Sequence, residues 1–205
     1  MSFYAKHILP HLIDLTMRNK ETKRLRTEWV PNARGDVLEI GIGSGLNLPF
    51  YSHDVHHVYG VDPSLELLRM AHKRAMGLSV RVDFLSQSAE KPLPLTDESI
   101  DTVVMTWTLC SIPQPSRALR EMRRVLKADG RLLFIEHGHS SDSRVVTWQD
   151  RLTPFWKRIA GGCHLNRKID DLITEAGFRI TDLRTFYFPG PRPMTYTYQG
   201  MAQRA

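Results

Sequence analysis

Short, nearly continuous apolar runs recur between residues 37 and 135, and glycine or polar residues separate them. Such runs are typical of strands that are buried on both faces of a parallel sheet. The predicted strands are 37–40, 58–61, 80–85, 100–105 and 132–135.

Helical periodicity fills most of the intervals between these strands. After the first strand we expect only a short helix, because Pro49 is tolerated solely within a first turn. The next helix is predicted to begin at Pro63, with inner residues Leu65, Leu68, Ala71 and Ala75. A later helix is predicted to end with Gly130 as its C-cap, with inner residues Ala118, Met122, Val125 and Leu126.

The two ends of the chain show other patterns. Residues 3–29 predict one or two amphipathic helices interrupted by Pro10, and a break follows at 31–35. Residues 147–160 predict a helix that Pro154 breaks or kinks. A further helix is expected to stop at Gly177. Residues 178–188 and 194–203 then predict two strands around the proline-rich turn 189–193.

The order of these elements predicts an α/β fold with helices on both faces of a mostly parallel sheet of seven strands. The length of 205 residues suits one such domain. The chain is 41% hydrophobic and 24% charged, and no stretch approaches the 18 or so apolar residues of a membrane span.

Net charge and cysteine content indicate the possible partners and the cellular compartment of the protein. The net charge is +6, with a basic cluster at Arg18–Arg26 that is either a solvated helix face or a contact for an anionic partner. Two cysteines, Cys110 and Cys163, argue against a disulfide scaffold and suit a reducing compartment. The N-terminus has no apolar core after its charges, so we expect a cytoplasmic protein without a secretory signal.

The first strand ends in Glu39 and a turn with three alternating glycines, Gly41, Gly43 and Gly45. Glycines in this pattern indicate positive φ, or close approach of the backbone to another group. A strand followed by a glycine-rich turn is how α/β folds build a ligand site at the carboxyl end of a sheet.

The pattern Glu39-x-Gly41-x-Gly43-x-Gly45 resembles the first motif of class I S-adenosylmethionine-dependent methyltransferases. The resemblance continues in order over residues 35–137, through 60–64 (GVDPS), 87–90 (QSAE), 99–101 (SID) and 126–130 (LKADG). It implies a Rossmann-like sheet with a C-terminal antiparallel strand pair. It also implies one methyltransferase domain: a helical cap (1–33), a cofactor-binding core (34–137), and an acceptor lid with a terminal hairpin (138–205).

The resemblance implies S-adenosylmethionine as cofactor and S-adenosylhomocysteine as product. The implied cofactor residues are Glu39, Gly41, Gly43, Gly45, Asn47, Asp62, Pro63, Ser88, Ala89, Thr106 and Trp107. Asp62 would accept both ribose hydroxyls, although it can also cap the next helix. Ser88 stands where many relatives carry an aspartate, so its adenine contact is expected to be weaker or water-mediated. Glu39 can serve the turn structurally, and Trp107 can belong to the core.

A nucleotide-dependent dehydrogenase is the main alternative, because it also places an acid at the end of the second strand. Its fingerprint is G-x-G-x-x-G. In this chain Leu46 occupies the third glycine's place. The spacing therefore disfavours NAD(P), and a non-catalytic protein that binds S-adenosylmethionine stays open as a second alternative.

The acceptor is expected to be a small or lipid-like molecule. Residues 105–111 lack the Pro-Pro-aromatic signature of nucleic acid methyltransferases, and no aromatic-interleaved basic stripe occurs. The segment resembles that of quinone, phospholipid and alkyl-thiol methyltransferases, and the last group is also similar at 136–137, 148–149 and 162–167. Its members carry an apolar N-terminal anchor that this sequence lacks, which favours a soluble acceptor; peripheral membrane contact stays open.

Methyl transfer to a thiol, amine or hydroxyl requires removal of a proton. His137, after the fifth strand, is the first candidate base because its intrinsic pKa is near neutral, and His164 is the second. Either can instead be structural. Cys163 is expected to be an inert buried thiol, and no metal site is expected, because Cys163 and His164 lack further ligands. The predicted reaction is methyl transfer to a thiol, amine, hydroxyl or carbon of a small acceptor.

Overall fold

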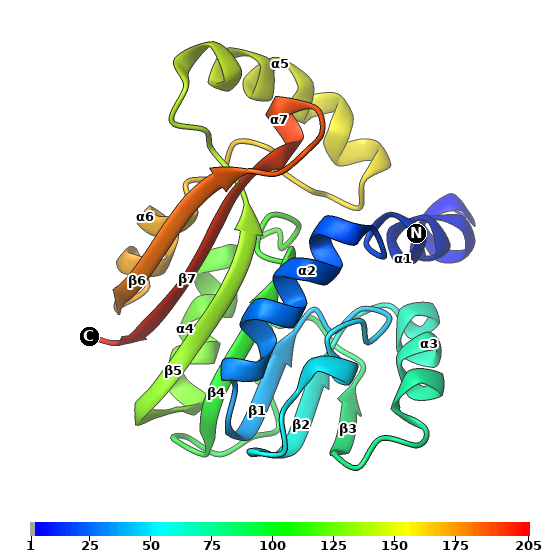
Figure 1. Cartoon of the computed structure of the whole chain (residues 1–205), viewed down its shortest axis with the longest axis vertical. Coiled ribbons are helices and arrows are strands. Elements are labelled where there is room, and N and C mark those ends of the chain that lie inside the picture. The colour runs from blue at the N-terminus through cyan, green and yellow to red at the C-terminus, as the bar shows by residue number, and fades with distance from the viewer. Residues whose placement is uncertain (1–2) are drawn as a thin grey trace.

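The computed structural model describes residues 3–205 as a seven-stranded sheet with helices on both faces (Figure 1). The spatial order of the strands is β3-β2-β1-β4-β5-β7-β6. Their bounds are β1 Gly35–Ile40, β2 Val55–Val61, β3 Arg81–Leu85, β4 Ile100–Thr106, β5 Leu126–His137, β6 Phe178–Tyr187 and β7 Tyr196–Arg204.

Strands β3, β2, β1, β4 and β5 run parallel, whereas β7 runs antiparallel to both β5 and β6. This confirms the predicted mostly parallel sheet with its terminal antiparallel pair. Ile40 lies opposite Val61 on β2 and Met105 on β4, so the carboxyl ends of the central strands are level. The segments that follow these strands therefore meet at one edge of the sheet.

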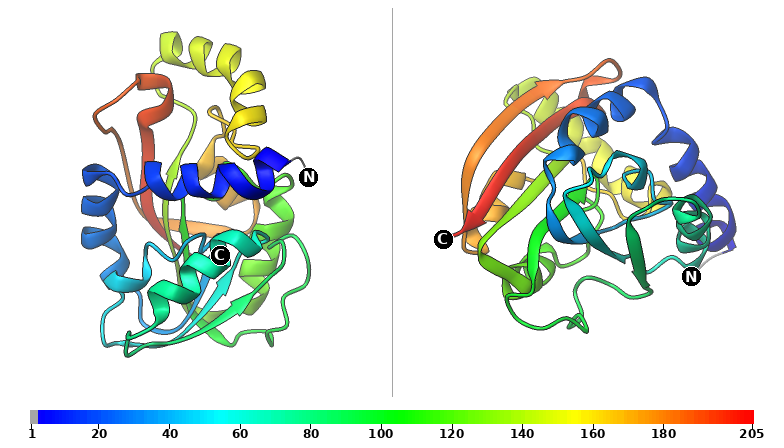
Figure 2. Two further views of the ribbon diagram at one scale, coloured as in Figure 1. Left: turned by 90° about the vertical axis from the view of Figure 1, so that its right-hand side faces the viewer. Right: turned by 60° about the horizontal axis from the view of Figure 1, so that its bottom comes forward.

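Two pairs of helices cover the faces of the sheet (Figure 2). Helices α2 (Lys20–Trp29) and α3 (Leu65–Ala75) pack Leu25, Trp29 and Leu68 into one apolar cluster. On the other face, α4 (Pro115–Val125) and α6 (Ile169–Glu175) contribute Leu119, Met122 and Ile173. In the central strands β1, β4 and β5, the apolar side chains between these helices are buried, which explains why these strands carry no polar alternation.

Further helices lie beyond the carboxyl ends of the parallel strands (Figure 1). They are η1 (Tyr4–Ile8), α1 (Leu9–Thr16), α5 (Ser143–Ile159) and the short α7 (Arg192–Thr195). Two single turns, η2 (Val30–Asn32) and η3 (Leu48–Phe50), flank β1, and Pro49 lies in the first turn of η3 as predicted. Pro10 likewise occupies the first turn of α1, where no hydrogen bond is lost.

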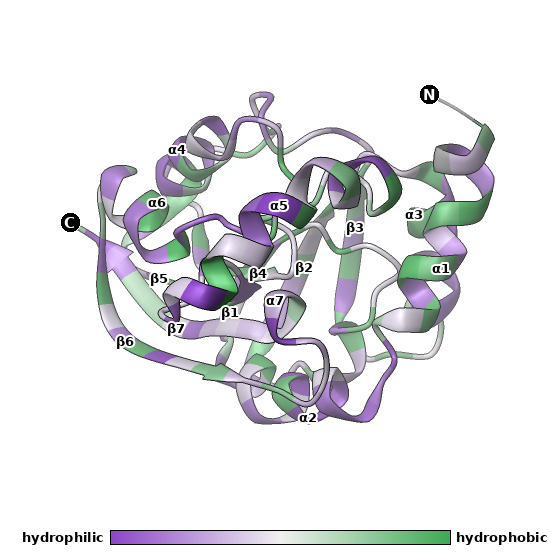
Figure 3. Ribbon diagram, turned by 90° about the horizontal axis from the view of Figure 1, so that it is seen from above, coloured by the Kyte–Doolittle hydropathy of each residue, from purple (hydrophilic) through white to green (hydrophobic). Residues whose placement is uncertain are grey.

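Three details of the prediction were wrong. Helix α3 starts after Ser64, whose side chain caps it, so Pro63 lies outside the helix, and Leu65 is 60% exposed. Helix α4 ends at Val125, because Leu126 is already extended and pairs with Ile100, which places Gly130 inside β5. Helix α5 spans Pro154 as one helix, and its ribbon bends along its length (Figure 2), so a kink is present and a break is not. Figure 3, which views the molecule from above the sheet, shows both hydrophilic and hydrophobic segments along the ribbon of α5.

Within residues 3–205, no helix is both long enough and apolar enough to cross a lipid bilayer.

Candidate functional site

The glycine turn after β1 takes the left-handed conformations that its sequence predicts. Gly41, Gly43 and Gly45 all have positive φ, of 67°, 54° and 80°. A Cβ on Gly41 would lie 2.2 Å from Oγ1 of Thr108, whereas one on Gly43 would meet no atom closer than 3.8 Å. Gly41 is therefore required for packing against the segment after β4, and Gly43 leaves the backbone open.

Gly45 serves a different purpose from the one predicted. A Cβ there would lie 2.9 Å from Leu48 and 3.1 Å from the backbone of Ala71 on α3. The third glycine thus lets the turn pack closely on α3, and it does not line the cavity described below.

Glu39 is 1% exposed and holds the turn together. Its Oε1 accepts a hydrogen bond from Asn47 (2.9 Å), and its Oε2 accepts one from the hydroxyl of Tyr51 (2.8 Å). Asn47 also donates to Thr106 at the end of β4 and accepts from Arg26 of α2. Burial raises the pKa of Glu39 to about 7 against the opposing effect of these donors.

Asp62 ends β2 and faces the same turn. Its Oδ2 accepts from the Gly43 main-chain N–H (3.1 Å), and its Oδ1 accepts from the Ser64 N–H (2.8 Å). Ser64 is the N-cap of α3, so Asp62 supports the helix start without capping it. Burial raises the pKa of Asp62 to about 6. Each oxygen retains capacity for a further donor from the cavity.

A polar cluster that the sequence did not predict anchors α1 to the glycine turn. Asp14, which is 7% exposed, accepts from Ser44 (2.6 Å) and Arg74 of α3 (2.7 Å), and it also pairs with Arg18. Burial alone would raise the pKa of Asp14, but these donors hold it below its ordinary value. The only sequence signal was an acid within an apolar helical pattern.

Trp107 follows β4 with a φ of 50°, which is uncommon outside glycine. Its main-chain N–H donates to the carbonyl of Ile135 (2.7 Å), and the Arg26 guanidinium lies 4.8 Å from the centre of the indole ring. The ring packs on the apolar cluster beneath α2 and also borders the cavity. Trp107 therefore belongs to the core and also faces the cavity, and its contact with the cofactor stays a prediction.

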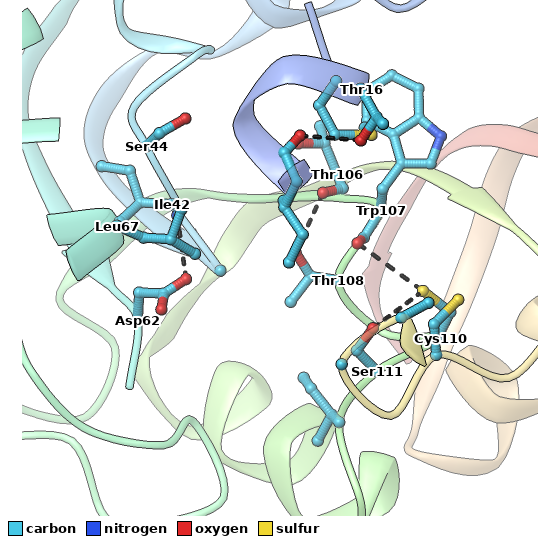
Figure 4. A pocket seen from close by; sticks show the side chains of 18 of the residues that line it. Thr16, Ile42, Ser44, Asp62, Leu67, Thr106, Trp107, Thr108, Cys110 and Ser111 are labelled. Atoms are coloured by element: carbon cyan, nitrogen blue, oxygen red, sulfur yellow. Dashed lines mark hydrogen bonds between the residues drawn. The ribbon is translucent and has the colours of Figure 1, made fainter. Parts of the chain in front are cut away.

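A cavity of about 620 Å³ lies over the carboxyl ends of the strands, beneath α1 and α5. Figure 4 shows Asp62 and Ile42 on one side of it and Trp107, Cys110 and Ser111 on the other. It brings together ten of the predicted cofactor residues: Glu39, Gly41, Gly43, Asn47, Asp62, Pro63, Ser88, Ala89, Thr106 and Trp107. The Ser88 hydroxyl donates to Glu90 (2.8 Å), a cavity residue that the prediction did not include.

The cavity also holds an imidazole and two thiols. His137 Nε2 lies 2.8 Å from Cys163 Sγ, and Cys110 is the third member of this cluster. The hydrogen bond from Cys110 lowers the pKa of Cys163, and the same contact together with burial raises the pKa of Cys110. Burial alone would lower the pKa of His137, but the interaction with Cys110 raises it. The sequence argument against a metal site considered only Cys163 and His164, whereas the fold brings Cys110 and His137 next to Cys163.

His164, the second candidate base, does not line the cavity. Its ring Nδ1 lies 3.2 Å from the carbonyl oxygen of Cys110, and its main-chain N–H donates to the same atom (2.9 Å). Burial lowers its pKa. His164 thus fastens the Cys163 segment to the Cys110 segment.

Residues 38–134 match the family model described as "Methyltransferase domain". The chain is 37% identical to thiol S-methyltransferase TMT1B of Rattus norvegicus, over 72% of this chain and 61% of the relative. The Homo sapiens enzyme of that name is 32% identical over 80% of this chain and 71% of the relative. Phosphatidylethanolamine N-methyltransferase of Cereibacter sphaeroides is 42% identical over 57% of this chain and 58% of the relative. The chain thus spans about three fifths of the rat and bacterial relatives.

Solved structures share the fold at low sequence identity. The crystal structure of the [4+2]-cyclase SpnF has a TM-score of 0.71 and 21% identity, over 90% of this chain and 80% of the other. A methyltransferase from Thermotoga maritima, described as a possible histamine N-methyltransferase, has a TM-score of 0.64 and 24% identity over 98% and 99%.

The cavity fits S-adenosylmethionine in shape and charge. Gly43 leaves room where a side chain would project, and two buried carboxylates, Glu39 and Asp62, border the space. Buried carboxylates are suited to a cationic ligand with hydroxyl and amino donors. Because the human TMT1B enzyme is 32% identical and covered over 71% of its length, and because residues 38–134 match the methyltransferase domain, the chain belongs to the S-adenosylmethionine-dependent methyltransferase family and takes S-adenosylmethionine as its cofactor.

Proposed function

We propose that this protein transfers a methyl group from S-adenosylmethionine to a small apolar acceptor, with a thiol as the favoured acceptor group. The observation that carries the proposal is one cavity that joins the glycine turn and Asp62 to the His137–Cys163 pair. The cofactor, when bound, supplies an electrophilic methyl group on a sulfonium. The chain itself must hold, orient and deprotonate the acceptor.

In this proposal the carboxylate side of the cavity binds the cofactor. Asp62 accepts the ribose hydroxyls with the oxygen capacity that Gly43 and Ser64 leave free. Glu39 acts mainly through Asn47 and Tyr51, which fix the turn, and its charge favours the cofactor's amino group. Ala89 and Glu90 offer the polar groups for the adenine edge, because the Ser88 hydroxyl is already used by Glu90.

The opposite side of the cavity would bind the acceptor. Its lining is largely apolar: Leu9, Leu12 and Ile13 from α1, and Trp156 and Ile159 from α5. A hydrophobic lining with a few polar groups suits a small organic acceptor. The relatives named for thiol and phosphatidylethanolamine methylation support an apolar or amphipathic acceptor of this kind.

His137 is the side chain that we propose to act on the acceptor. It lies in the cavity wall next to Cys163, at the end of β5, where the strand termini converge. Because His164 is held to the Cys110 carbonyl, we assign it a positioning role.

We further propose that residues 1–33 and the segment 138–166 act as cap and lid over the core 34–137. The hydroxyl of Tyr4 donates to the carbonyl of Ile159 (2.8 Å), which ties the two across the cavity. Exposed apolar side chains on α1 and α5, among them Leu15 and Phe155, support peripheral contact with a membrane surface. The free thiols Cys110 and Cys163 support a cytoplasmic location.

Calorimetric titration with S-adenosylhomocysteine, with NAD as control, tests the proposal. Binding of S-adenosylhomocysteine at micromolar concentration and none of NAD is expected. NAD binding would favour the oxidoreductase alternative. Binding of S-adenosylhomocysteine without methylation of any alkyl thiol, amine or phospholipid would favour a non-catalytic binding protein.

A further inference from the structure

Three metal-ligating side chains converge in the wall of the cavity from separate parts of the chain. Cys110 follows β4, His137 ends β5, and Cys163 follows α5. Their ligand atoms all lie within 4.8 Å of one another. Tetrahedral zinc, with bonds of about 2.0–2.3 Å, places its ligand atoms about 3.5–3.8 Å apart. Small side-chain movements would thus bring all three onto one ion.

Hydrogen bonds connect the chain segments that carry these three residues. Glu136, next to His137, accepts from the N–H groups of Thr108 (2.7 Å) and Leu109 (2.9 Å). His164, next to Cys163, is bonded to the Cys110 carbonyl. Arg167 also donates to the carbonyls of Leu109 and Ile112. These hydrogen bonds fix the positions of the three segments relative to one another, as the ligands of a metal ion require.

Burial and charge also favour a cation. Cys110 is 2% exposed and Cys163 and His137 are each 8% exposed, so water competes weakly for these atoms. Within residues 3–205, Oε2 of the buried Glu136 has no hydrogen-bond partner, and this carboxyl group interacts electrostatically with both His137 and Cys163. Soft thiolate ligands with one imidazole select zinc over magnesium or calcium.

We propose that Cys110, His137 and Cys163 bind one Zn²⁺ ion with its fourth position open to the cavity, and that this position takes the acceptor thiol. All three residues line the cavity that also holds the cofactor residues. Three protein ligands and an open position are typical of catalytic zinc. On binding, the S–H bond of the acceptor breaks, a Zn–S bond forms, and the proton leaves to solvent, so His137 acts on the acceptor as a ligand of the metal and not as a general base. The acceptor is then a thiolate at neutral pH.

The thiol-binding part of this inference rests on the proposed methyl transfer, whereas the metal site does not. Untagged protein, reduced and stripped of metal, is titrated with Zn²⁺ against a chromogenic chelator. One equivalent is expected to bind. Cys110→Ser, Cys163→Ser and His137→Ala are each expected to weaken zinc binding by at least about 100-fold, beyond the loss typical of supporting residues. His53→Gln, at a surface histidine, is the matched control and is expected to bind as wild type.

Co²⁺ gives a readout that needs no turnover. The Co²⁺ form should show the visible bands of a tetrahedral thiolate site, and ethanethiol should add intensity to the sulfur-to-metal band where ethanol does not. Absence of metal uptake by reduced wild-type protein overturns the metal site. Uptake without a response to ethanethiol overturns the acceptor assignment. S-adenosylhomocysteine affinity, measured on the same samples, checks folding of the variants and tests the proposed function separately.

Discussion

The main-chain N–H of Gly43 donates a 3.1 Å hydrogen bond to Oδ2 of Asp62. This contact couples the end of β2 to the turn after β1, at the edge where the two strands lie in register. One carboxylate thereby shapes the turn and faces the cofactor cavity.

Replacing Asp62 with alanine should weaken S-adenosylhomocysteine binding by about 1.5–3 kcal/mol, the amount typical of hydrogen bonds to a charged group. Calorimetry measures the loss. Asp182→Ala, on the exposed strand β6, is the control and should bind normally. Unchanged affinity in a folded Asp62→Ala protein would remove Asp62 from the cofactor site.

Gly41→Ala should abolish cofactor binding and lower the free energy of unfolding. Gly77→Ala is a matched control, because Gly77 also has positive φ (86°) but no atom within 4 Å of its Cβ position. The control carries only the left-handed backbone penalty, about 1–2 kcal/mol. Gly41→Ala adds the clash with Thr108, for which overpacking suggests a further 1–3 kcal/mol or so. Equal losses in urea denaturation would contradict the close contact.

The pKa of Glu39, raised to about 7, predicts a pH dependence of stability. Since the folded state favours the protonated acid, its contribution is present below pH 4.5 and is lost as the pH rises through about 7. Arg26 and Asp62 are the charged groups that act on Glu39, in opposite directions.

Between pH 5 and pH 8 the unfolding free energy of the wild type should therefore fall relative to Glu39→Gln, by up to about 3 kcal/mol. Urea denaturation of both proteins at pH 5 and pH 8 measures the change in unfolding free energy of each. Asp62 is present in both proteins, so the difference between the two profiles reports Glu39 together with its electrostatic coupling to Asp62. Parallel profiles would show that Glu39 ionises normally.

Tyr4→Phe removes the hydroxyl that ties η1 to the end of α5. The loss of one net hydrogen bond, about 0.5–1.5 kcal/mol, predicts two- to tenfold or so faster release of S-adenosylhomocysteine. Stopped-flow fluorescence measures this rate. Tyr59→Phe, on β2, is the control; a wild-type rate for Tyr4→Phe would argue against a coupled cap and lid.

Peripheral membrane contact predicts that the protein cosediments with anionic phospholipid vesicles. Phe155→Ser and Leu15→Ser, at side chains that are 67% and 68% exposed, should reduce the bound fraction. Met76→Ser is the control, since Met76 is 73% exposed but follows α3 at the far end of the sheet. An equal loss for all three variants would indicate nonspecific adsorption.

Local sequence patterns were enough to predict the parallel strands and the glycine turn of this protein. The apolar runs predicted the parallel strands, because a strand buried on both faces needs no polar alternation. The glycine spacing predicted the turn, because positive φ is a property of single residues. Eleven cofactor residues, Asp62 among them, were predicted from the motifs, and all but Gly45 line the cavity.

Only the tertiary structure decided which distant residues meet. Leu126 lies in β5 because Ile100 pairs with it, and its own helical periodicity gave no sign of this. Asp14 reaches Ser44 across 30 positions, and His137 reaches Cys163 across 26. Such contacts depend on how the segments after separate strands converge at one edge of the sheet. No local pattern carries that information, so the imidazole and the two thiols became a single site only in the fold.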